Sequence, residues 1–277
     1  MPLFDSVLIT FGTAGTGGFG LPVPVADYTA AQQWIITVFM LLFGVNFNLY
    51  YLLLLRAFRP VATSRELWAY GGVFAVSTGI ITANVMSQFA SFGEGLRHSA
   101  FTVASVVTTT GFATTDFNLW PGLSRSIIFV LLFVGGCAGS TAGGLKVSRV
   151  MLLFKTVGRE LKRLVHPRSV SVVRLEGKRV EETTVHSTVA YFILYFMLLF
   201  GGFLLIAWED FSLETNLTAV ITCLNNVGPG LGEVGPMGGF SGYSDFSKGL
   251  LSLIMLLGRL EIYPLVLALM PATWTKE

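Results

Sequence analysis

The sequence predicts an all-α membrane protein in which a short helix followed by a glycine-rich loop recurs along the chain. Hydrophobic residues make up 53% of the 277 residues and charged residues only 12%, whereas a soluble domain carries about 25% charged residues. Three short apolar runs each lead into a loop that combines glycine with threonine or asparagine. These loops are Thr13–Phe19, Thr108–Ala113 and Leu224–Gly230. One such loop carries little weight, whereas three in similar surroundings indicate a repeat.

The apolar segments that precede the loops are too short to cross a bilayer, which takes about 20 residues. We expect them to form half-helices that enter the membrane and return to the same side. The predicted half-helices are Phe4–Ala14, Arg97–Val107 and Phe211–Cys223. At the end of the third one, Asn225 and Asn226 are expected to brace the loop through hydrogen bonds rather than to bind an ion with their side chains.

Longer apolar runs between these units predict transmembrane helices. Four complete spans are expected, at Trp34–Leu55, Leu67–Phe89, Val189–Trp208 and Leu250–Met270. A further span opens at Ser124–Val134 and resumes at Leu145–Phe154, but five glycines in the ten residues Gly135–Gly144 interrupt it. Non-helical backbone at membrane depth is tolerated only where it is buried in protein or lines a watery cavity. This segment is therefore expected beside a pore.

Basic residues predict the orientation of the chain. Arg56, Arg59 and Arg65 follow the first span, and ten more lysines and arginines lie between Lys146 and Arg179. The opposite side carries only three, at positions 97, 125 and 248. Because cytoplasmic loops are enriched in lysine and arginine, the basic segment is expected in the cytoplasm and the glycine loops toward the outside. Within the basic segment, 169–175 and 178–181 predict a small hairpin around Glu176-Gly177.

The glycine loops suggest a cation filter. Glycine lets the backbone adopt positive φ, so each loop can turn carbonyl oxygens toward one axis and replace the hydration shell of a small cation. Gly18, Gly111 and Gly228 are equivalent in the alignment, and their carbonyl oxygens are expected to face the ion; alternatively, the glycines only permit close helix packing. The expected filter residues are Thr16, Gly17, Gly18 and Phe19; Thr109, Thr110, Gly111 and Phe112; Asn226, Val227, Gly228 and Pro229.

Other functions find little support. The loops hold no cluster of histidine or carboxylate that would indicate a transition metal, and no Ser/His/Asp set or phosphate loop indicates an enzyme. Neither a covalent cofactor nor a nucleic-acid partner is expected. Two rivals stay open: a secondary transporter with broken helices and alternating access, and a non-conducting membrane fragment.

Four motifs in order carry a resemblance that covers essentially the whole chain. They read TTTGFATTDF from residue 108, GGCAGSTAGGLKVSR from 135, LNNVGPGLGEVGP from 224 and GRLEIYPLVLAL from 258. This pattern resembles the TrkH/KtrB family of potassium transporters. The resemblance implies repeats of outer helix, half-helix, filter loop and second helix around one pore, a homodimer in the cytoplasmic (inner) membrane, and a cytoplasmic TrkA- or KtrA-type nucleotide-binding regulatory subunit.

The resemblance also assigns residue roles. It implies K⁺ at the backbone carbonyls of Gly18, Gly111 and Gly228, and a positive charge of Arg259 directed at the permeation path. From the residues alone, Arg259 is as well explained by an internal pair with Glu261 or a backbone carbonyl. The resemblance further implies a gate made of Gly135, Gly136, Cys137, Ala138, Gly139, Ser140, Thr141, Ala142, Gly143 and Gly144.

The chain departs from the family pattern because it contains three filters rather than four. We expect the first repeat and the outer helix of the second to be absent, so that the chain is a C-terminal portion of a longer protein. On this basis residues 1–60 hold the half-helix, filter and second helix of the second repeat. Residues 61–165 form the third repeat, 166–182 the cytoplasmic basic loop, and 183–277 the fourth repeat.

Overall fold

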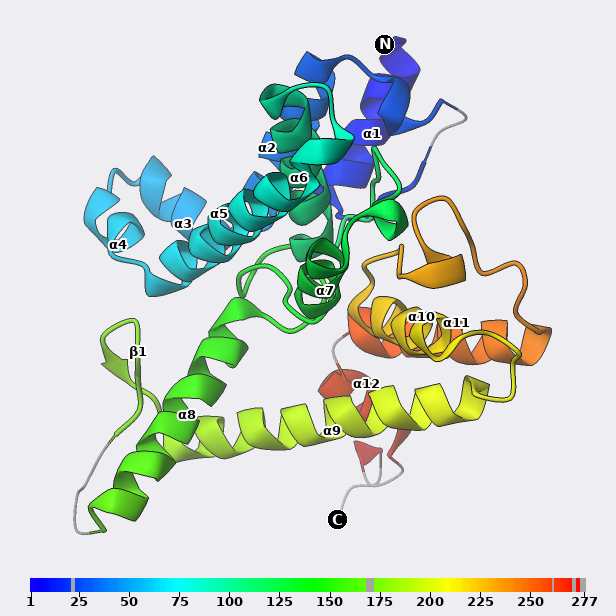
Figure 1. The fold of residues 1–277 in the computed structure, drawn as a ribbon. Helices are drawn as coiled ribbons and strands as arrows, with labels where there is room; N and C mark the ends of the chain where they lie inside the picture. The colour runs from blue at the N-terminus through cyan, green and yellow to red at the C-terminus, as the bar shows by residue number, and fades with distance from the viewer. Residues whose placement is uncertain (21–22, 168–171, 261, 271–272, 275–277) are drawn as a thin grey trace.

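The computed structural model describes residues 1–20, 23–167, 172–260, 262–270 and 273–274. The fold is helical, and the described residues contain one β-hairpin, whose two strands have two residues each (Figure 1). The α-helices are α1 Leu3–Ala14, α2 Ala30–Phe43, α3 Phe47–Leu54, α4 Phe58–Ala62, α5 Arg65–Val85, α6 Phe92–Val107, α7 Gly122–Leu131, α8 Val147–Val165, α9 Glu182–Ile206, α10 Leu213–Asn225, α11 Asp245–Arg259 and α12 Ile262–Leu269. Short 3₁₀ turns lie at Val25–Asp27, Met86–Gln88, Phe117–Leu119 and Gly232–Val234.

Two helices among the described residues are long and apolar enough to cross a membrane. They are α5 with its 3₁₀ extension, Arg65–Gln88, and α9, Glu182–Ile206. The pair α2 and α3 makes a third if it counts as one span, although the two helices are bent by 91°. The short helices α1 and α10 match the predicted half-helices closely.

The predicted continuous span Trp34–Leu55 is wrong, because α2 ends at Phe43 and α3 starts at Phe47. Asn46 caps α3 by accepting a hydrogen bond from the amide of Asn48 at 2.9 Å. The freed backbone is bonded elsewhere: the carbonyl of Gly44 accepts from the amide of Cys137 at 2.9 Å. Because these groups have a protein partner, the break costs little at membrane depth.

Two further boundaries differ from expectation. Helix α6 begins at Phe92 rather than Arg97, because the Ser91 hydroxyl accepts from the amide of Glu94 and the Glu94 carboxylate accepts from the amide of Ala90, each at 3.2 Å. This reciprocal cap is the signal that the prediction missed. The predicted span Leu250–Met270 is divided into α11 and α12, and Pro264 in the first turn of α12 prevents a continuous helix across the break.

Helices α6 and α10 form the centre of the packing. Helix α6 packs against α2, α5 and α7, and α10 packs against α9 and α11. Nearly every residue from His98 to Thr110, and from Thr218 to Asn225, is buried. Such short helices buried on all sides are supported by their neighbours rather than by lipid, which places the loops at their ends inside the protein.

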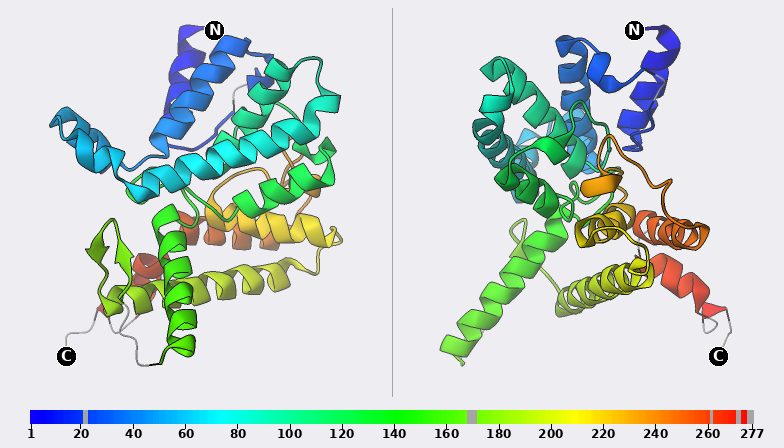
Figure 2. Two further views of the ribbon diagram at one scale, coloured as in Figure 1. Left: turned by 60° about the vertical axis from the view of Figure 1, so that its left-hand side comes forward. Right: turned by 45° about the vertical axis from the view of Figure 1, so that its right-hand side comes forward.

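The basic segment is more helical than predicted. Helix α8 continues to Val165; it packs against α5 and α9, and its C-terminal end projects beyond them (Figure 2). The predicted hairpin is confirmed where the structure describes it: β1 Arg174–Leu175 pairs with β2 Lys178–Arg179 in antiparallel register around Glu176-Gly177. Residues 168–171, which include the start of the predicted first strand, lie outside the described residues.

Candidate functional site

The loops after α1, α6 and α10 share one backbone conformation. Each begins with a residue in the left-handed region: φ is 48° at Thr16, 54° at Thr109 and 54° at Asn226. Two residues later each places a glycine at positive φ, with 61° at Gly18, 86° at Gly111 and 108° at Gly228. Left-handed φ is a genuine outlier for a β-branched residue such as threonine. Its occurrence at equivalent positions shows that the packing imposes it.

The hydrogen bonds that end the three helices are also equivalent. The amide of Gly17 donates to the carbonyl of Gly12 at 2.8 Å. In the same register, Thr110 donates to Ser105 and Val227 donates to Thr222, each at 2.9 Å. Each of these amides bonds a carbonyl of its own helix, which closes a tight turn at the helix end. The turn fixes the direction in which the carbonyl groups of the loop residues point. One structural unit therefore occurs three times despite differing sequences.

The three loops pack in a head-to-tail order. A Cβ added at Gly18 would overlap the backbone carbonyl oxygen of Thr110, in the next loop. A Cβ added at Gly111 would overlap the carbonyl oxygen of Val227, the residue equivalent to Thr110 in the third loop. The three glycines predicted to be equivalent thus lie in one contiguous assembly, and two of them are close to a neighbouring carbonyl.

Gly228 interrupts this order. Among the described residues, the one atom within 4 Å of a Cβ built there is the Cα of Gly111, at 3.5 Å. Gly228 and Gly17 are exposed, and Phe19 is 80% exposed, whereas its equivalent Phe112 is only 4% exposed. The assembly is therefore open between its first and third loops.

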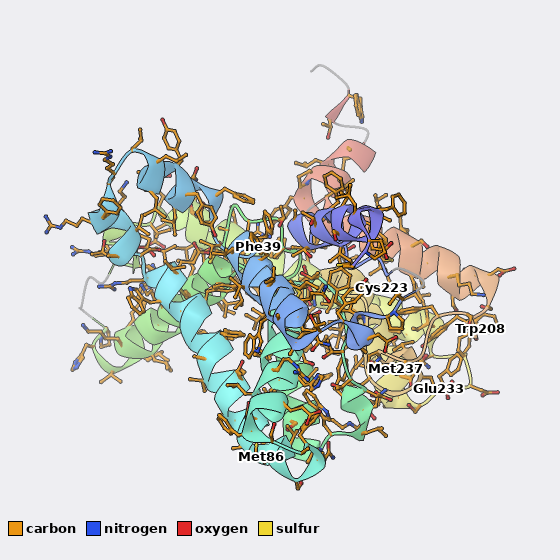
Figure 3. The ribbon with its side chains drawn as sticks, turned by 90° about the horizontal axis from the view of Figure 1, so that it is seen from above. Phe39, Met86, Trp208, Cys223, Glu233 and Met237 are labelled. Atoms are coloured by element: carbon orange, nitrogen blue, oxygen red, sulfur yellow. The ribbon has the colours of Figure 1, made fainter. Side chains whose placement is uncertain are left out.

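A cavity of about 790 Å³ occupies this opening. It lies between α1 and the pair α10 and α11, and is mostly apolar. Its lining includes Phe19, Cys223, Gly228 and Met255. Seen from above, Cys223 lies near the middle of the molecule, while Trp208 is at its edge (Figure 3). The cavity is bordered by residues of the first and third loops, among them Gly17 and Gly228.

The segment Gly135–Gly144, which we call the intramembrane loop, is closed at its base. Its flanking residues Val134 and Leu145 form a parallel bridge, and the amide of Gly135 donates to the carbonyl of Leu145 at 2.9 Å. Next to this bridge, Lys146 donates to the carbonyl of Ala142. The loop is therefore a defined structure between α7 and α8, as the glycine content predicted.

The intramembrane loop touches all three glycine-loop units. The hydroxyl of Thr16 lies 2.9 Å from the carbonyl oxygen of Thr141, which accepts its hydrogen bond. The amide of Gly143 donates to the hydroxyl oxygen of Thr109 at 2.6 Å. A Cβ on Gly143 would also overlap the carbonyl oxygen of Asn225, at the end of α10. A single short segment is therefore in contact with each of the three units.

Arg259, at the end of α11, reaches the first loop. Its Nη2 donates to the carbonyl oxygen of Gly15 at 2.8 Å. It lines the large cavity and also a second cavity of about 230 Å³, which residues 139–144 of the intramembrane loop border. A backbone carbonyl is thus a partner of this charge; the alternative partner Glu261 lies outside the described residues.

The two asparagines at the end of α10, Asn225 and Asn226, brace the third unit as predicted. Asn225 is fully buried, donates to the carbonyl of Leu132 at 2.8 Å and exchanges hydrogen bonds with the hydroxyl of Tyr195. Asn226 donates to the carbonyl of Met255 at 3.1 Å. These bonds tie the end of α10 to α7, α9 and α11.

Two contacts of the site were missed by sequence reasoning. Asn118 bonds both backbone groups of Gly232, donating to its carbonyl at 2.9 Å and accepting from its amide at 3.0 Å, so it joins the outgoing ends of the second and third loops. Glu66, buried at the start of α5, accepts from the amides of Ala138 and Ser148. Glu66 could have been found from the sequence, because it is a lone carboxylate at the start of an apolar helix.

This fold and these loops define a helical protein of the membrane class, in which two of the described helices are long and apolar enough to cross a bilayer. The chain belongs to the TrkH family: the family model described as a cation transport protein matches residues 73–275. This match confirms the family resemblance.

Similar proteins carry the name of a potassium uptake system. The chain is 34% identical over 284 residues to the Trk system potassium uptake protein TrkH of Halomonas elongata, covering 100% of this chain and 58% of that protein. The TrkH of Salmonella typhimurium is also 34% identical, with 99% and 57% covered. The crystal structure of the potassium transporter TrkH from Vibrio parahaemolyticus matches with a TM-score of 0.90 and 32% identity, covering 99% of this chain and 60% of that one. The chain thus spans less than two thirds of these relatives.

Proposed function

We propose that this chain forms three quarters of a potassium-selective pore and its gate. The observation that carries the proposal is the head-to-tail packing of three equivalent glycine loops against one intramembrane loop. Carbonyl oxygens of Gly18, Gly111 and Gly228 coordinate K⁺ in place of water. The filter is completed by their neighbours Thr16, Gly17, Phe19, Thr109, Thr110, Phe112, Asn226, Val227 and Pro229.

The helices that lead into the filter favour a cation. Helices α1, α6 and α10 each deliver their C-terminal end to the loop assembly, and a helix C-terminus carries a partial negative charge. The C-terminal turns of α6 and α10 are buried, so the charge at these two ends is weakly screened. Three such ends around one axis lower the free energy of a dehydrated cation there.

The open side of the assembly is the place of a fourth loop. Loops that pack head to tail leave two free ends unless they close into a ring. In this set of three loops, the free ends are Gly228 of the third loop and the carbonyl of Gly17 in the first. A fourth glycine loop, supplied from outside residues 1–277, fits the cavity of about 790 Å³ between them. This agrees with the share of about 58% that the chain covers in its relative.

The intramembrane loop, from Gly135 to Gly144, is the gate. It borders the filter through Thr141 and Gly143, and it occupies the region that an ion enters after leaving the filter. Arg259, which lines both cavities, supplies a positive charge to the same region. This charge shortens the residence of K⁺ below the filter, because like charges repel more strongly where water is scarce.

The setting of the pore follows from charge and family. The chain lies in the cytoplasmic membrane with its filter loops toward the outside and the basic loop 166–182 in the cytoplasm. Its partners are membrane lipid, a second copy in a homodimer, and a cytoplasmic nucleotide-binding subunit of the TrkA or KtrA type. No nucleic acid is involved.

Rubidium uptake by a potassium-auxotrophic bacterial strain tests the proposal. Two proteins are compared: the chain alone, and a chimera in which the part of the Halomonas elongata relative outside the match completes it. The chimera is expected to restore growth at low potassium and to take up rubidium, whereas the chain alone inserts into the membrane without conducting. A chimera that inserts but takes up no rubidium contradicts the proposal; so does one whose uptake survives alanine at all three filter glycines.

A further inference from the structure

The cytoplasmic hairpin and the intramembrane loop meet the same turn of helix. This turn is the start of α5, where the first amides of a helix lack partners within it. The hydroxyl oxygen of Ser64 accepts a hydrogen bond from the amide of Leu67 at 3.4 Å. The amides of Arg65 and Glu66 are instead bonded by the Glu176 carboxylate, one by each oxygen, at 3.1 and 2.9 Å. Glu176 is 110 residues away from Glu66 in the chain.

The hairpin holds Glu176 at a fixed place. Glu176 occupies the hairpin turn with a φ of 50°, a conformation rare for a residue other than glycine. The hairpin itself is attached to α8 and α9: Lys155 donates to the carbonyl of Arg174 at 2.8 Å, and Val173 is buried against Leu152 and Val185. A carboxylate so placed also stabilises the positive end of the α5 dipole.

The Glu66 side chain extends the connection to the intramembrane loop. Its Oε1 accepts from the amide of Ala138, inside the loop, at 2.7 Å. The same oxygen accepts from the amide of Ser148, in the first turn of α8, at 3.1 Å. Glu66 is only 8% exposed, so both amides would be left without a partner if this carboxylate moved. Leaving buried amides unpaired is costly.

We infer that Glu176 and Glu66 are positioning residues that transmit the position of the cytoplasmic hairpin to the intramembrane loop. Glu176 holds the first turn of α5, and Glu66 in that turn holds Ala138 and the start of α8. Lifting the hairpin away from α5 therefore loosens the loop. As a statement about gating, this rests on the proposed function, whereas the mechanical coupling does not.

Cys137 provides a readout that needs no ion flux. It adjoins Ala138, is fully buried, and is a free thiol. The other free thiol, Cys223, is removed by Cys223→Ala, and the full chain is placed in lipid nanodiscs. The rate of maleimide labelling at Cys137 then reports how often the loop opens.

The variants follow the two steps of the coupling. Glu66→Ala is expected to raise the labelling rate about tenfold, since two buried hydrogen bonds are lost, and Glu66→Gln, which keeps an acceptor oxygen, stays closer to the parent. Glu176→Ala is expected to raise it about threefold. The double variant matches Glu66→Ala, because both residues act through one contact.

Matched controls separate this coupling from general loosening. Glu94→Ala removes a carboxylate that caps a different helix, and Glu181→Ala removes an exposed carboxylate two residues beyond the hairpin; neither is expected to change labelling. If Glu176→Ala labels like Glu181→Ala, the inference is overturned, even where Glu66→Ala fails to fold. Rubidium uptake by the chimera is scored separately, so loss of uptake with the labelling pattern intact contradicts only the proposed function.

Discussion

The hydroxyl oxygen of Thr109 accepts a hydrogen bond from the backbone amide of Gly143, at 2.6 Å. This bond joins the left-handed residue of the second glycine loop to the intramembrane loop. Both residues are buried. There is no room for a side chain at position 143, because a Cβ there would overlap the carbonyl oxygen of Asn225. The geometry of one loop is therefore linked to that of the other.

Thr109→Val tests this link. Valine keeps the branched shape but cannot accept, so the buried amide of Gly143 loses its partner at a cost of about 1–3 kcal/mol in the free energy of unfolding. Denaturation in detergent measures the loss. Thr10→Val is the control, since the Thr10 hydroxyl is exposed and bonds only within its own helix. Equal stability of the two variants would contradict the assigned contact.

Gly18→Ala is expected to abolish rubidium uptake by the chimera. The added Cβ meets the carbonyl oxygen of Thr110, which is backbone and cannot move aside alone, and positive φ adds about 1 kcal/mol of strain. Gly20→Ala is a close control, because a Cβ there has open space and φ is not positive. Uptake by Gly18→Ala at the rate of Gly20→Ala would show that the loops do not shape the ion path.

Arg259→Ala is expected to raise rubidium flux through the chimera. The repulsion between this charge and the permeating cation is about 1 kcal/mol even at high dielectric, so removing it is expected to raise the flux roughly fivefold. Arg259→Lys keeps the charge and is expected to retain the parental flux, although it loses the bond geometry to Gly15. The exposed Arg59→Ala serves as control. Flux unchanged in Arg259→Ala counts against a role of this charge in the pore.

Glu209, which lies outside the membrane spans, is expected to make the stability of the protein depend on pH. Hydrogen bonds from the hydroxyl of Ser244 and then that of Ser247, at 2.5 and 2.6 Å, hold the pKa of this carboxyl below its usual 4.5. A lowered folded-state pKa means that the stabilisation is complete above pH 4.5 and is lost as the pH falls through the folded-state value.

Melting temperatures measured from about pH 6 down to about pH 3 check this dependence. The parent protein is expected to lose more stability on acidification than Glu209→Gln, which has no proton to take up. Asp210→Asn, at the exposed neighbour, is the control and is expected to follow the parent. Parallel curves for parent and Glu209→Gln would remove Glu209 from the acid response.

Much of the local structure could be predicted from the sequence. The half-helices α1 and α10, the interruption at Gly135–Gly144 and the hairpin at Glu176-Gly177 follow from apolar run length and from glycine, which act over a few residues. The break between α2 and α3 was missed, although Gly44 and Asn46 mark it. An apolar run of 20 residues outweighed these two residues in the prediction, because its continuity is the stronger average signal for a span.

The sequence by itself therefore determined the class of protein, the three loops and their equivalent glycines, because backbone conformation at glycine and helix length are local properties. Only the tertiary structure decided that Thr110 faces Gly18, that Thr109 holds Gly143, and that Glu66 bonds Ala138. Glu66 and Ala138 are 72 residues apart, and nothing in either local sequence encodes the partner. Such contacts arise from the packing of whole helices, in which each buried amide must find an acceptor wherever the fold provides one.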